Sequence, residues 1–247
     1  MLKYICIIVF MFICSTVFAE PITQFGQGNG VLTIGTILDE KAKYKNVEIS
    51  NRGDLYGGLT ISPGKNWSVS VRYKQLDAER EMSSTYYGQT FSANQHGKVK
   101  EGDIIFNFKL KDATPKSPMF SVYGGIKVIK LDIDPKTFEG AVTINTPAGP
   151  KTYSGKLTIA GKHGKVVGPM IGMTMVYPNK IADIWIDGHY CHYVNGIEVG
   201  LSKEIVKNLL LNVSYFYDRY RYHEYDLSDK GVRVGMSYKF KMGTVRK

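Results

Sequence analysis

The sequence predicts an all-β fold in which about ten strands (eight or twelve also fit) form an antiparallel transmembrane β-barrel. Apolar and polar residues alternate over many segments, which is the pattern of a strand with one apolar and one polar face. After residue 19 the chain has no apolar run of about 18 residues, the length that a membrane helix needs. Short and long connections alternate along the chain, as expected for short periplasmic turns and longer external loops.

The last strand alternates most regularly. Its apolar positions are Val232, Val234, Met236, Tyr238 and Phe240, and the positions between them are Arg233, Gly235, Ser237 and Lys239. A polar turn at 226–231 is predicted to join it to a strand that begins at Leu209. A soluble sandwich or barrel would bury such apolar faces in a core, whereas a membrane barrel would turn them toward lipid. The alternation alone does not separate these two folds.

The other strands follow from the same pattern. In chain order, the predicted strands are 31–38, 47–61, 67–74, 104–111, 120–128, 166–177, 183–190, 197–202, 209–218 and 232–240. The sequence Val194-Asn195-Gly196 is predicted to be a turn.

The connections sort by length to the two ends of the predicted barrel. Short connections follow Ile61, Leu110, Tyr177 and Leu201. The two longest segments, 75–100 and 134–165, fall at the opposite end, and we expect them to be external loops. The second is predicted to contain a hairpin of strands 141–146 and 152–160. A soluble sandwich has no reason to place its long connections at one end.

Aromatic residues gather near both ends of the strands. Those near the short connections are Trp67, Phe120, Tyr177, Tyr238 and Phe240, and those nearer the long ones are Tyr73, Tyr190, Tyr215 and Tyr217. Tyrosine and tryptophan favour the lipid–water boundary because the ring is apolar and its polar tip needs a hydrogen bond. Aromatic residues are enriched in all strands, but their arrangement in two bands favours the membrane barrel.

Residues 1–19 are predicted to be a signal peptide that is cleaved after Ala19. Lys3 supplies the positive start, and residues 4–12 supply the apolar run. The alternative is a retained anchor helix, for which this run is short. Cleavage would remove Cys6 and Cys14 and leave Cys191, so we expect no intrachain disulfide.

The chain is strongly basic, with a formal net charge of +10. Lys3 is the only charge in residues 1–19, so the remaining chain carries +10 − 1 = +9. This excess favours anionic partners such as lipid headgroups, lipopolysaccharide phosphates or acidic glycans, whereas export argues against nucleic acid. Alternatively, scattered lysines do no more than keep the surface soluble.

Taken together, these features resemble those of bacterial outer-membrane β-barrel proteins. The segment 232–240 resembles the C-terminal strand that such proteins present to the barrel assembly machinery, although here residues 241–247 follow it. The resemblance implies location in the bacterial outer membrane. It also implies outer-membrane lipid, lipopolysaccharide and the assembly machinery as partners.

The polar faces of the strands would line the lumen of such a barrel. The predicted lumen residues are Arg72, Lys74, Asn107, Lys109, Lys127, Asp183, Asp187, Glu198, Asp218 and Arg233. Buried charges need partners, so these residues are expected to form a salt-bridged plug. The alternative is a small water-filled pore that favours anions, because inward bases outnumber inward acids in this prediction.

Two pairs of residues suggest catalysis but do not establish it. Asp132 with Asp134, and Asp187 with His189, share strand faces because they are two residues apart. The omptin proteases are similar in using an Asp–Asp and an Asp–His pair, but nothing else here matches them. His189, Cys191 and His192 lack further metal ligands. We therefore predict no enzyme, no metal and no cofactor.

The sequence predicts a structural, surface-binding or limited-permeation role. The exposed lysines expected to contact a polyanion are Lys151, Lys156, Lys162 and Lys165. Three alternatives remain open at this point: a small anion-favouring pore, an outer-membrane hydrolase, and a soluble periplasmic β-barrel that binds a small ligand.

Overall fold

The structure of the chain is a computed structural model. It describes residues 27–44, 47–51, 54–86, 89–114, 117–222 and 225–242. The predicted signal peptide lies outside these ranges. Within them the chain forms strands and turns, and no helix is long and apolar enough to cross a membrane.

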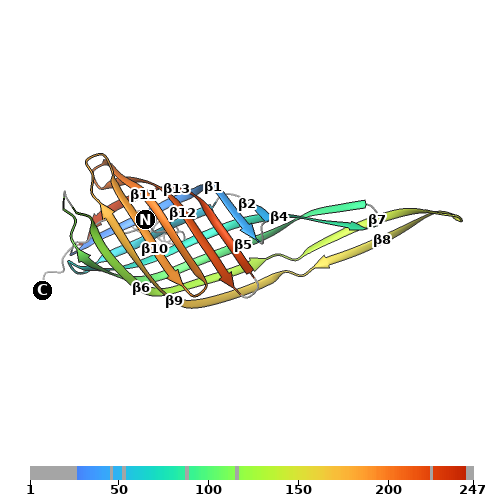
Figure 1. Ribbon diagram of the computed structural model, residues 1–247, viewed down its shortest axis with the longest axis horizontal. Coiled ribbons are helices and arrows are strands. Elements are labelled where there is room, and N and C mark those ends of the chain that lie inside the picture. The colour runs from blue at the N-terminus through green and yellow to red at the C-terminus, as the bar shows by residue number, and fades with distance from the viewer. Residues whose placement is uncertain are drawn as a thin grey trace, which may run out of the picture.

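Ten of the described strands form a closed antiparallel barrel (Figure 1). They are β1 (Asn29–Tyr44), β3 (Asp54–Ser62), β4 (Trp67–Tyr86), β5 (Gln89–Lys111), β6 (Met119–Ile133), β9 (Lys162–Tyr177), β10 (Asp183–Cys191), β11 (Val194–Val206), β12 (Leu209–Tyr222) and β13 (Tyr225–Lys241). The barrel closes because β1 pairs with β13 on one side and with β3 on the other. The predicted fold class and strand number are therefore confirmed.

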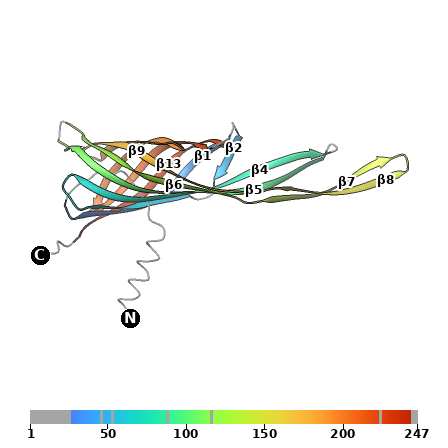
Figure 2. The same ribbon diagram turned by 90° about the horizontal axis from the view of Figure 1, so that it is seen from below.

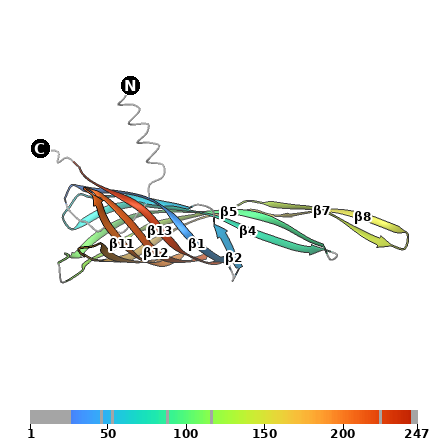
Figure 3. The ribbon, with the colours of Figure 1, turned by 90° about the horizontal axis from the view of Figure 1, so that it is seen from above.

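Three remaining strands lie at one end of the barrel. The short strand β2 (Val47–Asn51) pairs with β1 and β4 there. Strands β7 (Lys136–Thr146) and β8 (Gly149–Ile159) pair only with each other among the described strands. They form a hairpin that projects far from the barrel, on the same side as the long ends of β4 and β5 (Figures 2 and 3). This hairpin is called the arm below.

Residues 75–100 are not the irregular loop that the polar composition predicts. They continue β4 and β5 in unbroken register as far as the pair Tyr86–Gln89. Backbone hydrogen bonds join the two strands along this extension whatever their side chains are, so the sequence pattern does not predict it. The barrel wall is therefore much taller at β4, β5, β6 and β9 than at β10 and β11.

Three smaller boundaries also differ from the sequence prediction. The predicted strand 47–61 is divided into β2 and β3. The turn between β10 and β11 lies at His192-Tyr193, and the predicted turn 194–196 belongs to β11. The predicted turn 226–231 belongs to β13.

Large inward side chains lie across glycines of the neighbouring strands. A Cβ atom at Gly172 would lie 2.2 Å from Cζ of Tyr123, and one at Gly200 would lie 2.2 Å from Cζ2 of Trp185. Trp185 is fully buried and its Nε1 donates a hydrogen bond to Ser202 Oγ over 2.9 Å. Glycine is required at these positions by close approach across the sheet.

We therefore expect Gly172→Val to destabilise the barrel by roughly 1–3 kcal/mol, because a buried ring that is already hydrogen-bonded has to move. Gly188→Val is the control, because Gly188 lies in the next register row, on the outer face of β10, and a Cβ there would meet nothing within 4 Å. Urea titration of the barrel refolded into lipid vesicles measures both variants. Equal urea unfolding midpoints for the two variants would show that the contact between Tyr123 and Gly172 does not limit the size of the side chain at residue 172.

Candidate functional site

The interior of the barrel holds a network of charged side chains. Four bases, Arg72, Lys74, Lys127 and Arg233, face six acids, Glu101, Asp103, Asp187, Glu198, Asp218 and Asp229. They come from seven strands, and each occupies an inward position of its strand's alternation. Acids outnumber bases in this network, so the premise of the anion-favouring pore is wrong.

Lys74 is the centre of the first cluster. Its Nζ donates to Asp229 Oδ2 over 2.6 Å, to Asp218 Oδ2 over 2.9 Å and to the Tyr220 hydroxyl over 3.2 Å. The same ammonium lies 4.3 Å from the centre of the Phe216 ring. All three ammonium protons therefore have acceptors, which is what a buried lysine needs.

Lys127 forms the second cluster, with two acids of the adjacent strand β5. Its Nζ lies 2.7 Å from Glu101 Oε2 and 3.2 Å from Asp103 Oδ1. The Tyr220 hydroxyl donates to Glu101 Oε1 and also accepts from Lys74. Tyr220 therefore links the first two clusters across the lumen.

Arg233 forms the third cluster, on β13. Its guanidinium pairs with Glu198 and lies 3.6 Å from Asp218 Oδ2. The Ser214 hydroxyl donates to the same glutamate. The guanidinium carbon lies 4.1 Å from the centre of the Phe216 ring, so one ring packs against both Arg233 and Lys74.

Asp187 forms the fourth cluster, on β10. It accepts hydrogen bonds from the Tyr123 hydroxyl over 2.8 Å and from Thr174 Oγ1 over 2.6 Å. Arg72 Nη1 lies 3.9 Å away, and the guanidinium stacks over the Tyr123 ring at 5.2 Å. Arg72 Nε and Nη2 have no hydrogen-bond partner among the described residues.

A cavity of about 60 Å³ lies between these clusters. Its walls include Arg72, Lys74, Glu101, Asp187 and Arg233. Since a water molecule needs about 10–15 Å³ of such volume and several polar partners, the cavity has room for a few waters and not for an organic solute.

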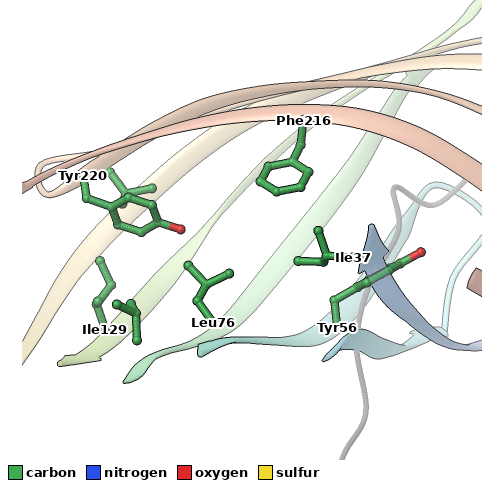
Figure 4. Packing of buried hydrophobic residues seen from close by; sticks show 8 residues of the cluster. Ile37, Tyr56, Leu76, Ile129, Phe216 and Tyr220 are labelled. Atoms are coloured by element: carbon green, nitrogen blue, oxygen red, sulfur yellow. The ribbon is translucent and has the colours of Figure 1, made fainter. Parts of the chain in front are cut away.

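A layer of apolar side chains also lies in the lumen, beside the charged network. The apolar layer consists of Ile37, Tyr56, Leu76, Val99, Ile129, Val194, Phe216 and Tyr220. Leu76, Val99 and Ile129 are each two residues along the strand from Lys74, Glu101 and Lys127, so they occupy the next inward positions. Figure 4 shows the layer in the interior, with Ile37, Tyr56, Leu76, Ile129, Phe216 and Tyr220 labelled. The sequence prediction of a wholly polar lumen missed this layer.

The structure places the other predicted lumen residues around this centre. Asn107 is buried and donates to Ser70 Oγ over 3.2 Å. Lys109 pairs with Asp112, and Asp183 accepts from the Asn179 amide over 3.3 Å, both near the short turns and apart from the network. The sequence prediction missed Glu101, Asp103 and Asp229. Glu101 and Asp103 lie an even number of residues from Asn107 on the same strand, so the alternation places all three on one face.

The two predicted catalytic pairs do not come together. Asp187 and His189 face the interior, where His189 Nε2 lies 3.5 Å from Asp218. Asp132 lies on the outer face of β6, where hydrogen bonds from Lys130 (2.8 Å) and His163 (3.1 Å) lower the pKa of its carboxyl group. Among the described residues no group of three potential ligands could hold a metal ion.

The outer face of the barrel is a belt of exposed apolar side chains. They include Ile34, Leu55, Val71, Ile104, Phe106, Phe108, Ile126, Ile171, Met173, Ile184, Ile197, Val199, Leu211, Val213 and Met236. Aromatic residues border the belt, with Trp67, Tyr177 and Tyr238 exposed near the short turns and Tyr190, Tyr215 and Tyr217 exposed nearer the other end. An apolar surface that surrounds the whole molecule is incompatible with water. The molecule is a β-barrel of the outer-membrane type. The soluble barrel with apolar faces turned inward is therefore wrong.

The four predicted polyanion contacts separate into two groups in this barrel. Lys151 and Lys156 are exposed on strand β8 of the arm. Lys162 and Lys165 are exposed on β9, at the foot of the arm, where Lys165 pairs in register with Lys130.

Comparison with known proteins finds similarity of fold. No protein-family model matches the chain, and no curated protein matches its sequence. The translocator domain of the autotransporter NalP from Neisseria meningitidis has a TM-score of 0.48 and 13% identity over 88% of this chain and 90% of that one. The β-domain of the Bordetella autotransporter BrkA has a TM-score of 0.46 and 8% identity over 86% and 99% of the two chains.

The attachment invasion locus protein Ail of Yersinia pestis is also similar, with a TM-score of 0.40 and 10% identity over 87% of this chain and 100% of that one. A second Ail structure, with a TM-score of 0.37, is a complex with the heparin analogue sucrose octasulfate. At these TM-scores and identities the comparisons assign neither a family nor a ligand to this barrel.

Proposed function

We propose that this barrel is a surface-binding protein of the bacterial outer membrane, whose arm contacts extracellular polyanions and whose lumen is closed to solutes. The observation that carries the proposal is the projection of the arm away from the barrel (Figure 1). The arm pairs with none of the ten described strands whose outer faces form the belt and extends away from them, so we infer that it lies in water outside the membrane. By this argument the end with the arm faces the exterior.

The charge of the arm supports a polyanionic ligand. The segment 134–165 carries Lys136, Lys151, Lys156, Lys162 and Lys165 against Asp134 and Glu139. The arm is anchored at its foot, where the Asp134 amide donates to the His96 carbonyl over 3.0 Å and Gln95 Nε2 donates to the Asp134 carbonyl over 3.0 Å. An anchored hairpin holds its lysines away from the membrane, where a long anionic polymer can reach several at once.

We expect Lys151→Glu combined with Lys156→Glu to weaken heparin binding about tenfold or more, since each reversed lysine near an anionic surface is worth roughly 1 kcal/mol. Binding by the unaltered barrel is also expected to weaken as salt is raised. Surface plasmon resonance on immobilised heparin measures both effects.

The matched control is Lys203→Glu combined with Lys207→Glu. It makes the same change of charge on exposed lysines at the opposite end of the barrel. We expect this control to bind heparin like the unaltered barrel. Loss of binding in both double variants would show that net charge acts without the arm, and binding that is insensitive to salt would contradict the proposal.

A further inference from the structure

Three lysines lie side by side on the outer face of the taller wall. Lys100 of β5 is directly opposite Lys130 of β6, and Lys130 is directly opposite Lys165 of β9. Directly paired residues share a face of the sheet, with Cβ atoms about 5 Å apart, so the three span about 10 Å. These three residues are called the lysine row. Like charges in directly opposed positions destabilise a sheet, so the row calls for a reason other than strand pairing.

The acids nearby offset only part of this charge. Lys130 pairs with Asp132 over 2.8 Å, and Asp132 also binds His163. Lys98 pairs with Asp77 over 3.5 Å in the next row along the wall. Lys100 and Lys165 have no hydrogen-bond or ion-pair partner among the described residues. With Lys98 counted, four lysines face two aspartates, and the surface keeps a formal charge of +4 − 2 = +2.

The position of the row on the barrel is as informative as its charge. The next outward row toward the short turns is Gly102, Val128 and Val167, and the one after it is Ile104, Ile126 and Pro169. Ile104, Ile126 and Val167 are each more than half exposed. The lysine row therefore marks the upper edge of the apolar belt, where lipid headgroups meet acyl chains.

We propose that the lysine row is a binding site for a lipid whose headgroup carries two phosphates. The phosphates lie on Lys100, Lys130 and Lys165, and the acyl chains lie on the apolar rows below. Two phosphates held several ångströms apart match a row about 10 Å wide better than a single phosphate does. The site lies on the barrel wall and differs from the arm, although it rests on the membrane placement proposed above.

The experiment uses the purified full-length barrel in detergent, with lipid A as the diphosphorylated glycolipid and native mass spectrometry to count bound lipid. The unaltered barrel is expected to retain lipid A. The triple variant Lys100→Gln, Lys130→Gln and Lys165→Gln is expected to bind lipid A about 10- to 100-fold more weakly. Each lysine near a membrane surface is expected to contribute a factor of about ten or less to the affinity. This variant removes repulsion between like charges, so its heat-modifiable migration is expected to persist.

The control variant is Lys65→Gln, Lys203→Gln and Lys207→Gln, which removes the same charge from exposed lysines beside the short turns. It is expected to bind lipid A like the unaltered barrel. Equal lipid A binding by the lysine-row variant and the unaltered barrel overturns the proposal, and so does an equal loss in the two triple variants.

Two further ligands distinguish the source of the phosphate. Phosphatidylglycerol, with one phosphate, is expected to bind more weakly, and equal affinity overturns the two-phosphate assignment. Inorganic pyrophosphate is expected not to displace lipid A at equal concentration, and displacement overturns the role of the apolar rows. The lysine-row variant keeps Lys151 and Lys156, so its heparin binding is measured separately and a failure of one proposal is distinguishable from a failure of the other.

Discussion

Replacing Lys74 with methionine is expected to lower the free energy of unfolding by about 3–5 kcal/mol, the usual cost of breaking a buried ion pair from one side. Asp218 and Asp229 would remain buried, at 4% and 0% exposure, without the ammonium that binds both. Methionine fills most of the volume of the lysine stem, so the loss measures the charge and not a cavity. Urea titration of the barrel in phosphatidylcholine vesicles gives the value.

Two companion variants make this result specific. Lys98→Met removes an exposed ion pair with Asp77 and is expected to cost less than about 1 kcal/mol. Adding Asp229→Asn to Lys74→Met is expected to recover part of the stability, because one uncompensated carboxylate is gone. A Lys74→Met barrel as stable as the Lys98→Met barrel would mean that the interior is wet enough to solvate these charges.

The unaltered barrel is expected to show no steady single-channel conductance in planar bilayers, whereas Phe216→Ala combined with Tyr220→Ala is expected to conduct. Both rings belong to the apolar layer, and Tyr220 also joins the clusters of Lys74 and Lys127. Removing both rings takes two of the largest side chains out of a narrow lumen that side chains otherwise fill, and we expect water and ions to enter the space. The opened lumen is expected to favour cations, because acids outnumber bases in the network.

The control for this pair lies on the same strand. Tyr215→Ala combined with Tyr217→Ala removes two rings from the lipid-facing side of β12, where both are exposed. We expect this barrel to stay closed. Steady conductance steps from the unaltered barrel would contradict the closed lumen, and conductance from the control would indicate that any weakening of β12 opens the barrel.

The number of strands, and which of their side chains face lipid, were predictable because lipid-facing and lumen-facing residues alternate strictly along each strand. The prediction failed where that alternation ends. Residues 75–100 have the composition of a loop, yet they continue β4 and β5. Gly196 was assigned to a turn, yet it lies in β11, where a Cβ would meet Asp218 Oδ1 at 2.0 Å. A glycine required by close packing and a glycine required by a turn look alike in a sequence.

The network was predictable only in part. The alternation along the strands identified four bases as inward-facing: Arg72, Lys74, Lys127 and Arg233. It did not identify the ion-pair partner of any of them. Lys74 meets Asp218 and Asp229 across sequence separations of 144 and 155 residues, which only the closed sheet brings together. Asp229 was also assigned to a turn.

The composition of the Lys74 cluster also bears on how the barrel assembles. Strand β13 supplies Asp229 to Lys74 and Arg233 to Glu198, and it is also the strand that pairs with β1 to complete the cylinder. An unfinished sheet that lacks this strand leaves Lys74 with one carboxylate fewer and Glu198 without its guanidinium. The ion pairs of the interior are therefore completed only when the final strand pairs. Partly assembled forms are penalised electrostatically as well as by their open edges, which favours an all-or-none transition between the open and the sealed cylinder.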